Sequence, residues 1–383
     1  MRIVIVGAGI AGLAAAAGLS RSGHEVTVVE RAGRLEPVGA GIALVANGYR
    51  ALDHLGVGDR LRMDVDPSWQ GGQRTPSGRM IMPIPIAPDY GVVHRSALHA
   101  VLFEAASGAE FQLGHEVVGI DDGGVVIRAS DRGADARPDP VEAIAADLVV
   151  GADGIRSIVR SSMPDDPGLR YSGYSAWRGV TETTVDMAGR VGESWGYRER
   201  FGYVPLADGR AYWFGVASLP AGTVYPDEAA EVDRRFSNWH EPIPALLAAT
   251  PPERVIRHDI DELRRPLRSY VRGRVVLVGD AAHAMTPNLG QGGGQGLEDA
   301  VTLSVLLAGA DAAGVPAAAL AEYDRLRRPR SQAIARRSRN IGRIAHLRGR
   351  AAVPVRDALL RLTPASALES ATRELTDWQL PAV

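Results

Sequence analysis

The stretch MRIVIVGAGIAGLAAAAGLSRSGHEVTVVE, residues 1–30, decides how the chain folds. Residues 3–6 are a continuous apolar run, typical of a strand buried in a parallel sheet. Residues 7–12 read Gly-Ala-Gly-Ile-Ala-Gly, and a small-residue helix follows them. Residues 26–29 form a second apolar run that ends at Glu30. This order of strand, glycine turn, helix, strand and acid predicts a βαβ unit with a dinucleotide fingerprint.

Each residue of the fingerprint has an expected task. The glycines provide a tight turn, close approach of a pyrophosphate, and close packing of helix on strand. Glu30 follows the last glycine at a spacing close to the roughly 20 residues expected for an acid that binds the adenosine ribose. Arg31 can pair with a 2′-phosphate, pack on an adenine or face solvent. The expected contacts to the dinucleotide are Gly7, Gly9, Ala11, Gly12, Glu30 and Arg31.

A second segment, VVLVGDAAHAMTPNLGQGGGQGLEDA at 275–300, offers another ligand-binding turn. Residues 275–278 predict a short buried strand, and the strand ends before Asp280. The glycine run at 290–296 precedes a helix expected over 297–307. Bare backbone at a helix N-terminus lets a ligand approach amide groups where the helix dipole favours negative charge. The candidate contacts are Asp280, Gly290, Gln291, Gly292, Gly293 and Gly294.

The middle of the chain changes character. Residues 147–150 predict a strand that runs into Gly-Ala-Asp-Gly, which places Asp153 at a strand end. Residues 69–86 predict a hairpin that joins a different sheet. Most aromatic residues fall in 171–219, where the pattern predicts antiparallel strands. These rings either fill a core or form a wall for a flat apolar ligand.

Composition excludes several classes of function. The chain has 383 residues and a net charge of −2, which gives no reason to expect nucleic acid or a membrane surface as partner. It has no cysteine and no lysine, which excludes thiolate chemistry, Schiff bases and a P-loop lysine. No metal-ligand spacing is visible. Without a long apolar run, no transmembrane helix is expected and a cytoplasmic protein is the default.

The C-terminal region is expected to be helical and arginine-rich. The run from Arg325 to Arg330 is interpreted as the solvated face of an amphipathic helix rather than a nucleic-acid site. His283 could serve as a catalytic base, but it is interpreted as a packed residue of its turn.

Three segments in this order resemble the single-component FAD-dependent aromatic hydroxylases, the para-hydroxybenzoate hydroxylase-like class. They are GAGIAG with Glu30, ADGIRSIVR at 152–160, and the segment at 279–300. The resemblance implies an α/β fold: a Rossmann-like FAD-binding domain with a parallel sheet, an interleaved antiparallel-sheet substrate domain, and C-terminal helices. The expected boundaries are 1–68, 91–165 and 265–320 for the FAD domain, 69–90 and 166–264 for the substrate domain, and 321–383 for the helical segment.

The resemblance also implies site residues and a reaction. It assigns Asp153 and Pro287 to cofactor motifs, and it places Ala43, Arg95 and the Val117 backbone against FAD. The implied enzyme is a monooxygenase in which NADH or NADPH reduces FAD. Reduced FAD and O2 then give a C4a-hydroperoxide that hydroxylates a small planar aromatic or heteroaromatic substrate. A monomer or homodimer is expected.

The segment at 199–212 is similar to that of bacterial FAD-dependent urate hydroxylases, where an arginine and a tyrosine at the positions of Arg200 and Tyr212 face the substrate. Those two residues are the candidate catalytic pair, and Arg200 can equally be a structural residue near the flavin. Other readings remain open: oxidation or epoxidation of a larger secondary metabolite, an electron-transfer flavoprotein, or an NAD-dependent dehydrogenase. The last would leave Asp280 and the glycine run without a task.

Overall fold

The computed structural model describes residues 1–35, 41–62, 66, 68–87, 89–121, 124–129, 142–310 and 316–382. Its first sheet has six strands in the order β17-β18-β11-β1-β2-β7. The pairs among β18, β11, β1, β2 and β7 are parallel, and β17 is antiparallel to β18. The strands are β1 (Arg2–Val6), β2 (Glu25–Glu30), β7 (Glu110–Leu113), β11 (Leu148–Gly151), β17 (Val271–Arg272) and β18 (Val275–Leu277).

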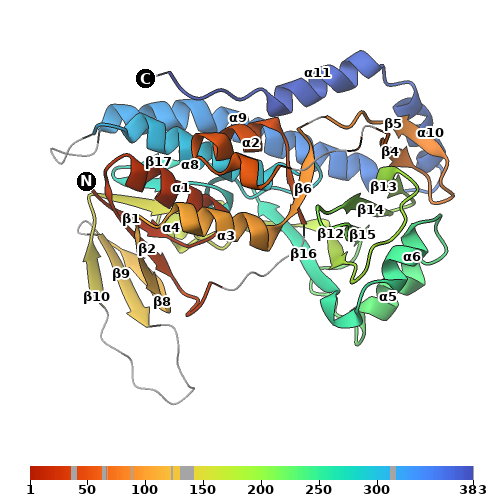
Figure 1. The fold of residues 1–383 in the computed structure, drawn as a ribbon, viewed down its shortest axis with the longest axis horizontal. Coiled ribbons are helices and arrows are strands. Elements are labelled where there is room, and N and C mark those ends of the chain that lie inside the picture. The colour runs from red at the N-terminus through yellow and green to blue at the C-terminus, as the bar shows by residue number, and fades with distance from the viewer. Residues whose placement is uncertain are drawn as a thin grey trace.

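Helices cover this sheet, as Figure 1 shows. The first, α1 (Ile10–Arg21), is made of small residues and packs against α3 (Arg95–Ala105) and α8 (Gly292–Leu307). Small side chains suit this position because every residue from Leu13 to Leu19 is buried. Two short ladders flank the sheet: β3 (Gly41–Leu44) with β6 (Gly91–His94), and β8 (His115–Ile120), β9 (Gly124–Ala129) and β10 (Glu142–Ala145).

A second large sheet forms the other part of the molecule. It has seven strands in the order β16-β12-β15-β14-β13-β4-β5, antiparallel throughout except for the β13–β4 pair. The predicted hairpin at 69–86 is confirmed as β4 and β5. The strands are β4 (Gln70–Arg74), β5 (Met80–Pro83), β12 (Leu169–Val180), β13 (Arg190–Trp195), β14 (Glu199–Pro205), β15 (Ala211–Ala217) and β16 (Ile256–Leu263).

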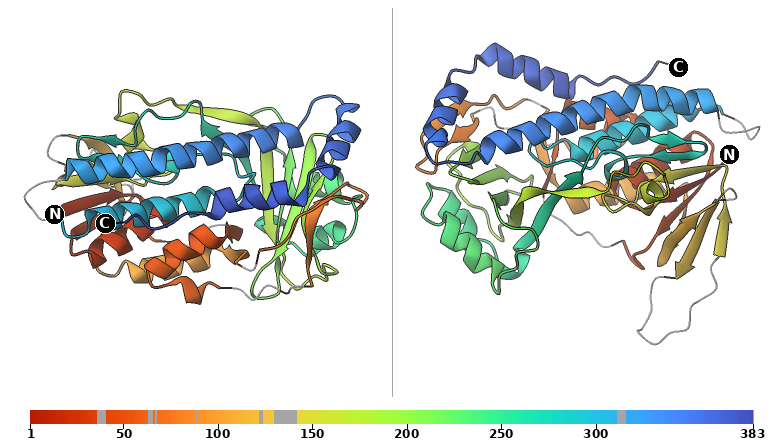
Figure 2. Two further views of the ribbon diagram at one scale, coloured as in Figure 1. Left: turned by 90° about the horizontal axis from the view of Figure 1, so that it is seen from above. Right: turned by 180° about the vertical axis from the view of Figure 1, so that it is seen from behind.

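The long helix α9 (Ala317–Ala345) lies beside α8 and extends toward the seven-stranded sheet (Figure 2). Two helices, α5 (Glu228–Phe236) and α6 (Ile243–Ala248), lie on the outer side of that sheet (Figure 1). The remaining short elements are α2 (Ala46–His54), α4 (Ile158–Ser161), α7 (Asp280–His283), α10 (Ala352–Arg361), α11 (Ala365–Thr376), and the 3₁₀ turns Gly58–Arg60 and Pro252–Arg254.

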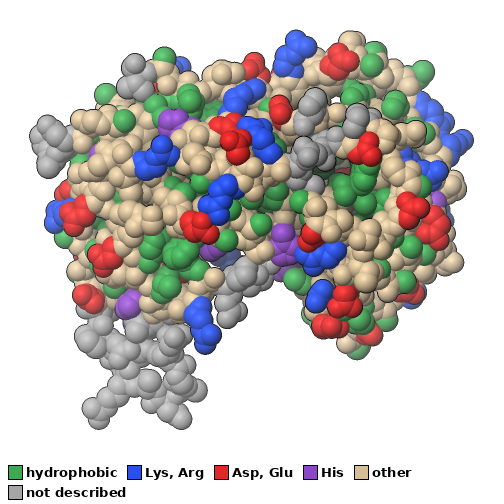
Figure 3. Space-filling model, viewed as in Figure 1, with side chains coloured by type: hydrophobic (Ala, Val, Ile, Leu, Met, Phe, Trp, Pro, Cys, Tyr) green, Lys and Arg blue, Asp and Glu red, His purple; other side chains and the backbone are tan. Residues whose placement is uncertain are grey.

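The sequence-based fold class is confirmed: a parallel sheet with helices, an antiparallel sheet interleaved with it, and C-terminal helices. The exact domain boundaries given above stay a prediction. Arginine and acidic side chains are interspersed over the face shown in Figure 3. Among the described residues, no helix combines the length and the apolar character needed to cross a membrane.

Candidate active site

The turn between β1 and α1 contains three glycines with different surroundings. Gly7 has φ +101°, and a Cβ there would lie 2.7 Å from the Ala152 carbonyl oxygen. A Cβ on Gly12 would lie 2.0 Å from the carbonyl oxygen of Gly7. Gly9, by contrast, has no heavy atom within 4 Å of that position, and α1 has no side-chain cap. The space is therefore closed at Gly7 by the backbone after β11 and at Gly12 by the backbone of Gly7. It is open at Gly9, where a pyrophosphate can approach the helix N-terminus.

Two backbone amides, one after β1 and one after β2, hold the Glu30 carboxylate in place. Its Oε2 accepts a hydrogen bond from the Ala8 amide at 2.9 Å, and its Oε1 accepts one from the Ala32 amide at 2.9 Å. Each oxygen keeps a second lone pair that can receive a ribose hydroxyl. Arg31 beside it is exposed. The assignment of both residues to an adenosine ribose stays a prediction.

Asp153 organises the turn after β11. Its carboxylate accepts hydrogen bonds from the Ser157 hydroxyl at 2.5 Å and from the amides of Ile158 and Val159 at 2.6 and 3.1 Å. Burial raises the pKa of Asp153, and the Ser157 hydrogen bond partly opposes it. These contacts cap the start of α4, so the structure gives Asp153 a role in shaping the turn. Its predicted contact with the cofactor stays a prediction.

The second glycine segment begins its helix earlier than expected. The predicted start at 297 is wrong, because α8 begins at Gly292, inside the glycine run. Close packing explains why glycines are wound into the helix: a Cβ on Gly293 would lie 2.5 Å from the Ile42 side chain of β3. Gly292 has open space at the same position, and the first turn of α8 has no side-chain cap and no acidic residue. The positive end of α8 is thus free to face a ligand.

The remaining predicted cofactor residues come from several elements. Asp280 is exposed at the start of α7, and Gly290, with φ +63°, would place a Cβ 3.2 Å from that of Ala43. Arg95 is the exposed first residue of α3, and Val117 is buried on β8. Pro287 and Gln291 lie between α7 and α8. Gly294 is in the first turn of α8, where a Cβ would lie 3.2 Å from the side-chain amide nitrogen of Asn47.

One face of the seven-stranded sheet contacts β3, which belongs to the separate β3–β6 ladder. A Cβ on Gly41 would lie 2.7 Å from the Tyr212 ring. Strand register places Gly202 opposite Phe214 and Glu193 opposite Gly202, and residues directly opposite share a face. We call this the inner face. It contains Glu193, Arg200, Gly202, Tyr212 and Phe214.

Arg200 is buried on the inner face and already has partners. Its Nη1 donates to Glu193 Oε2 at 3.2 Å, its Nη2 donates to Asn288 Oδ1, and its guanidinium lies 5.9 Å from the centre of the Tyr174 ring. Asn288 belongs to the loop between α7 and α8, so Arg200 ties the antiparallel sheet to the second glycine segment. Its Nε is buried without a hydrogen-bond partner.

Tyr212 is half-buried, with its ring centre 6.1 Å from that of Phe214. Burial raises the pKa of Tyr212, and nearby Arg178 opposes the shift. The prediction that the rings at 171–219 form one wall is only partly correct, because strands alternate their side chains between two faces. Trp177, Phe201 and Trp213 point to the outer side and pack with Phe236 of α5 in a separate core.

Residues 1–338 match the protein family described as FAD binding domain. The chain belongs to this FAD-binding family. It is 38% identical to aurachin C monooxygenase/isomerase of Stigmatella aurantiaca, with 97% of each chain covered. It is 33% identical to 2-heptyl-3-hydroxy-4(1H)-quinolone synthase of Pseudomonas aeruginosa, with 95% of this chain and 94% of that protein covered. The crystal structure of Klebsiella pneumoniae HpxO with FAD and uric acid is 28% identical and superposes with a TM-score of 0.83, covering 98% of this chain and 96% of the other.

As a member of this family, the chain is a flavoprotein monooxygenase that uses FAD and NAD(P)H. Its residues fit the cofactor. The open positions at Gly9 and Gly292 lie at two uncapped helix N-termini, and a side chain at neighbouring glycines would collide with backbone or with Ile42. Bound FAD supplies the two-electron chemistry with the nicotinamide and the activation of O2; the chain's residues hold it and shape the space beside it.

The sequence did not reveal the ionic cluster that holds α8 in this flavoprotein. Glu298 and Asp299 are fully buried, and Arg327 of α9, 1% exposed, donates to both, at 2.7 Å to Asp299 Oδ1. Arg330 donates to Glu298 at 2.7 Å. The expected solvated face is therefore wrong for these two arginines. Two adjacent acids within an otherwise apolar helix were the signal, since buried carboxylates require cations.

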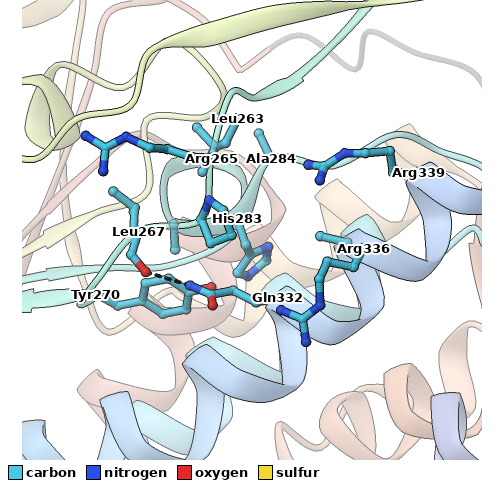
Figure 4. A pocket seen from close by; sticks show the side chains of 12 residues that line it. Leu263, Arg265, Leu267, Tyr270, His283, Ala284, Gln332, Arg336 and Arg339 are labelled. Atoms are coloured by element: carbon cyan, nitrogen blue, oxygen red, sulfur yellow. Dashed lines mark hydrogen bonds between the residues drawn. The ribbon is translucent and has the colours of Figure 1, made fainter.

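His283 belongs to the same cluster. Its Nε2 donates to Asp299 Oδ2 at 2.6 Å, and the Gly279 amide donates to the same oxygen at 2.8 Å. The interpretation of His283 as a packed residue of its turn is confirmed. Its side chain lines a small cavity of about 20 Å³. Figure 4 shows the ring among the side chains of Arg265, Arg336 and Arg339, which also line this cavity.

Proposed function

We propose that this monooxygenase hydroxylates a planar heteroaromatic ring that presents an N–H or O–H group to Glu193. The supporting observation is that the positive charge of Arg200 is already compensated. Glu193 forms an ion pair with the guanidinium and Asn288 accepts from its other terminal nitrogen, so the charge that Arg200 would offer to an anionic substrate is already balanced by a carboxylate. An anion beside this pair would also meet the carboxylate of Glu193.

The free oxygen of Glu193 is the expected recognition group. Its Oε2 accepts from Arg200 and from the Trp195 indole at 2.7 Å, while no hydrogen bond to Oε1 is formed within the described parts of the chain. Burial, and then the negative charge of Glu193, raises the pKa of Tyr90, and the same charge contributes to the raised pKa of Tyr212. The carboxylate charge therefore lies close to both tyrosines.

Flat apolar surface completes the proposed binding region. Gly202 allows the Phe214 ring to lie directly against the strand, because a Cβ there would sit 2.2 Å from that ring. Tyr212, Tyr90 and Ala43 pack together with Val92 in one apolar cluster beside β3. A planar ring held here would be shielded from water, which favours oxygen transfer over loss of the activated oxygen as peroxide.

The name of one relative supports a neutral ring, since the Pseudomonas aeruginosa enzyme is named for a 4(1H)-quinolone. Urate hydroxylation is the second candidate, and the observation in its favour is that Arg200 and Tyr212 share the inner face. A larger secondary metabolite is a third possible substrate.

The test is a screen of NAD(P)H consumption with product mass for 4(1H)-quinolone, its N-methyl analogue, urate and 4-hydroxybenzoate. We expect kcat/KM for the N–H compound to exceed that for the N-methyl compound by about tenfold to a hundredfold, because a buried acceptor is left unpaired by the latter. In Glu193→Gln, which keeps an acceptor for Trp195, this ratio should fall, with FAD content as the folding control. Equal rates on both quinolones, or preferred turnover of urate, would refute the proposal.

A further inference from the structure

A second cavity is lined by Tyr174, whose ring centre lies 5.9 Å from the Arg200 guanidinium. It is a cleft of about 440 Å³ between the first half of β12, the end of β16 and the last turns of α9. Tyr174 forms its inner wall. We call it the α9 cleft, and its charged lining residues are Arg170, Arg198, Glu262, Arg339, Arg343 and Arg348.

The α9 cleft has a large excess of positive charge. Its one lining carboxylate, Glu262, accepts from Arg170 at 2.7 Å and from Arg339 at 2.8 Å. Within the described chain, Arg198, Arg343 and Arg348 form no ion pair. Five guanidinium groups therefore face one carboxylate, which favours binding of an anion with more than one charge.

Buried polar atoms without partners also gather here. Arg198 Nε, Ser172 Oγ and His346 Nε2 are each buried without a hydrogen bond, and all three residues line the cleft. The His346 ring stacks on Tyr174 at 4.5 Å, and its Nδ1 lies 2.9 Å from the Ser218 hydroxyl. Since buried polar groups are nearly always paired, this concentration points to a ligand that supplies acceptor atoms.

The protonation of His346 fits such a ligand. Burial lowers its pKa to about 3, the charge of Arg200 acts in the same direction, and a hydrogen bond with the Arg198 backbone partly opposes them. The ring is therefore neutral at pH 7 and carries one N–H. If the Ser218 hydroxyl donates to Nδ1, that N–H is on Nε2, where it can donate to an anion.

We propose that the α9 cleft binds a phosphate group, and that this phosphate belongs to the nicotinamide dinucleotide that reduces the flavin. Guanidinium forks match phosphate oxygens in geometry as well as charge. The one dinucleotide fingerprint of the sequence, in residues 1–30, serves FAD, which leaves the reductant without a site of its own. This inference rests on the monooxygenase function.

The cleft is also close to the inner face. Tyr174 lines the cleft, its hydroxyl accepts from Asn288 at 2.9 Å, and its ring lies under the Arg200 guanidinium at 5.9 Å. One side chain thus separates the proposed phosphate site from the residues beside the substrate region.

The experiment compares Arg343→Ala/Arg348→Ala with a charge-matched control, Arg361→Ala/Arg373→Ala, whose two exposed arginines lie outside the cleft. Anaerobic flavin reduction is followed by absorbance against NADH or NADPH concentration in the FAD-loaded proteins. We expect Kd for the dinucleotide to rise about tenfold to a hundredfold in the cleft variant, with an unchanged limiting rate. The control variant should stay within twofold of wild type.

Calorimetric titration of inorganic pyrophosphate is the second readout, and it does not depend on turnover. Wild type should bind it, more weakly as salt is raised, and the cleft variant should not. Pyrophosphate binding that is lost in the variant while the dinucleotide Kd is unchanged would refute the dinucleotide as the ligand. Equal pyrophosphate binding in wild type and variant would overturn the phosphate site itself. Failure of NADH and NADPH to reduce wild-type flavin would instead contradict the monooxygenase function, and the titration would still decide about the cleft.

Discussion

Arg327→Met tests whether the buried ionic cluster holds α8 in place. Met fills a similar volume without the charge, so Glu298 and Asp299 lose the cation between them while remaining fully buried. Breaking a buried ion pair costs about 3–5 kcal/mol. Glu298 keeps Arg330 at 2.7 Å, and Asp299 keeps the His283 and Gly279 donors. We therefore expect the lower end, about 3 kcal/mol of lost unfolding free energy.

The assay is urea unfolding followed by tryptophan fluorescence, with flavin fluorescence reporting release of FAD. Arg325→Met is the matched control, because Arg325 lies on the exposed side of the same helix and its one ion pair within the described residues is with Glu322. Its unfolding midpoint should match that of wild type. Adding Glu298→Gln and Asp299→Asn to Arg327→Met should recover stability, since the unpaired charges are then gone. Equal midpoints for the Arg327 and Arg325 variants would refute the reasoning.

Three further outcomes follow from the same structure. Gly12→Ala should destabilise the fold by about 1–3 kcal/mol because its Cβ meets the backbone, whereas Gly9→Ala should fold normally and bind FAD weakly; thermal unfolding and flavin absorbance separate the two. Tyr212→Phe should lower product formed per NAD(P)H while keeping FAD, and loss of FAD would show a structural role instead. Burial opposes but does not outweigh His283 and Arg327, which together hold the pKa of Asp299 below its ordinary value. Its stabilisation is therefore complete above about pH 4 and lost as pH falls through the lower folded pKa, so wild type should lose melting temperature toward pH 3 more steeply than Asp299→Asn.

Local signals explain why so much of the fold could be predicted. The strand at 3–6, its glycine turn and the next strand are encoded within thirty residues, and a clash at Gly12 depends on its near neighbour Gly7. The early start of α8 was missed because glycines argue against a helix by propensity alone. The contact between Gly293 and Ile42, which favours glycine there, joins residues far apart in sequence.

The aromatic segment shows a second limit. Composition located the rings at 171–219, but strand register decides which side each one faces. Tyr212 and Phe214 lie on the inner face, where Tyr212 contacts Gly41 of β3, while Trp213 between them belongs to the outer core with α5. The proposed substrate wall is therefore narrower than the cluster of rings in the sequence, and the polar group proposed for it, Glu193, carries no sequence signal of its own.

Helix α9 contributes arginines both to the buried ionic cluster on α8 and to the α9 cleft. Arg327 holds the middle of α8 through Glu298 and Asp299, while Arg339 and Arg343 line the α9 cleft. At 1.5 Å per residue, Arg327 and Arg343 are about 24 Å apart along one helix. Loss of Arg327 should therefore disturb both FAD retention and dinucleotide affinity, whereas loss of Arg343 and Arg348 should affect only the dinucleotide. That asymmetry distinguishes a helix that positions both sites from two sites that merely lie near the same helix.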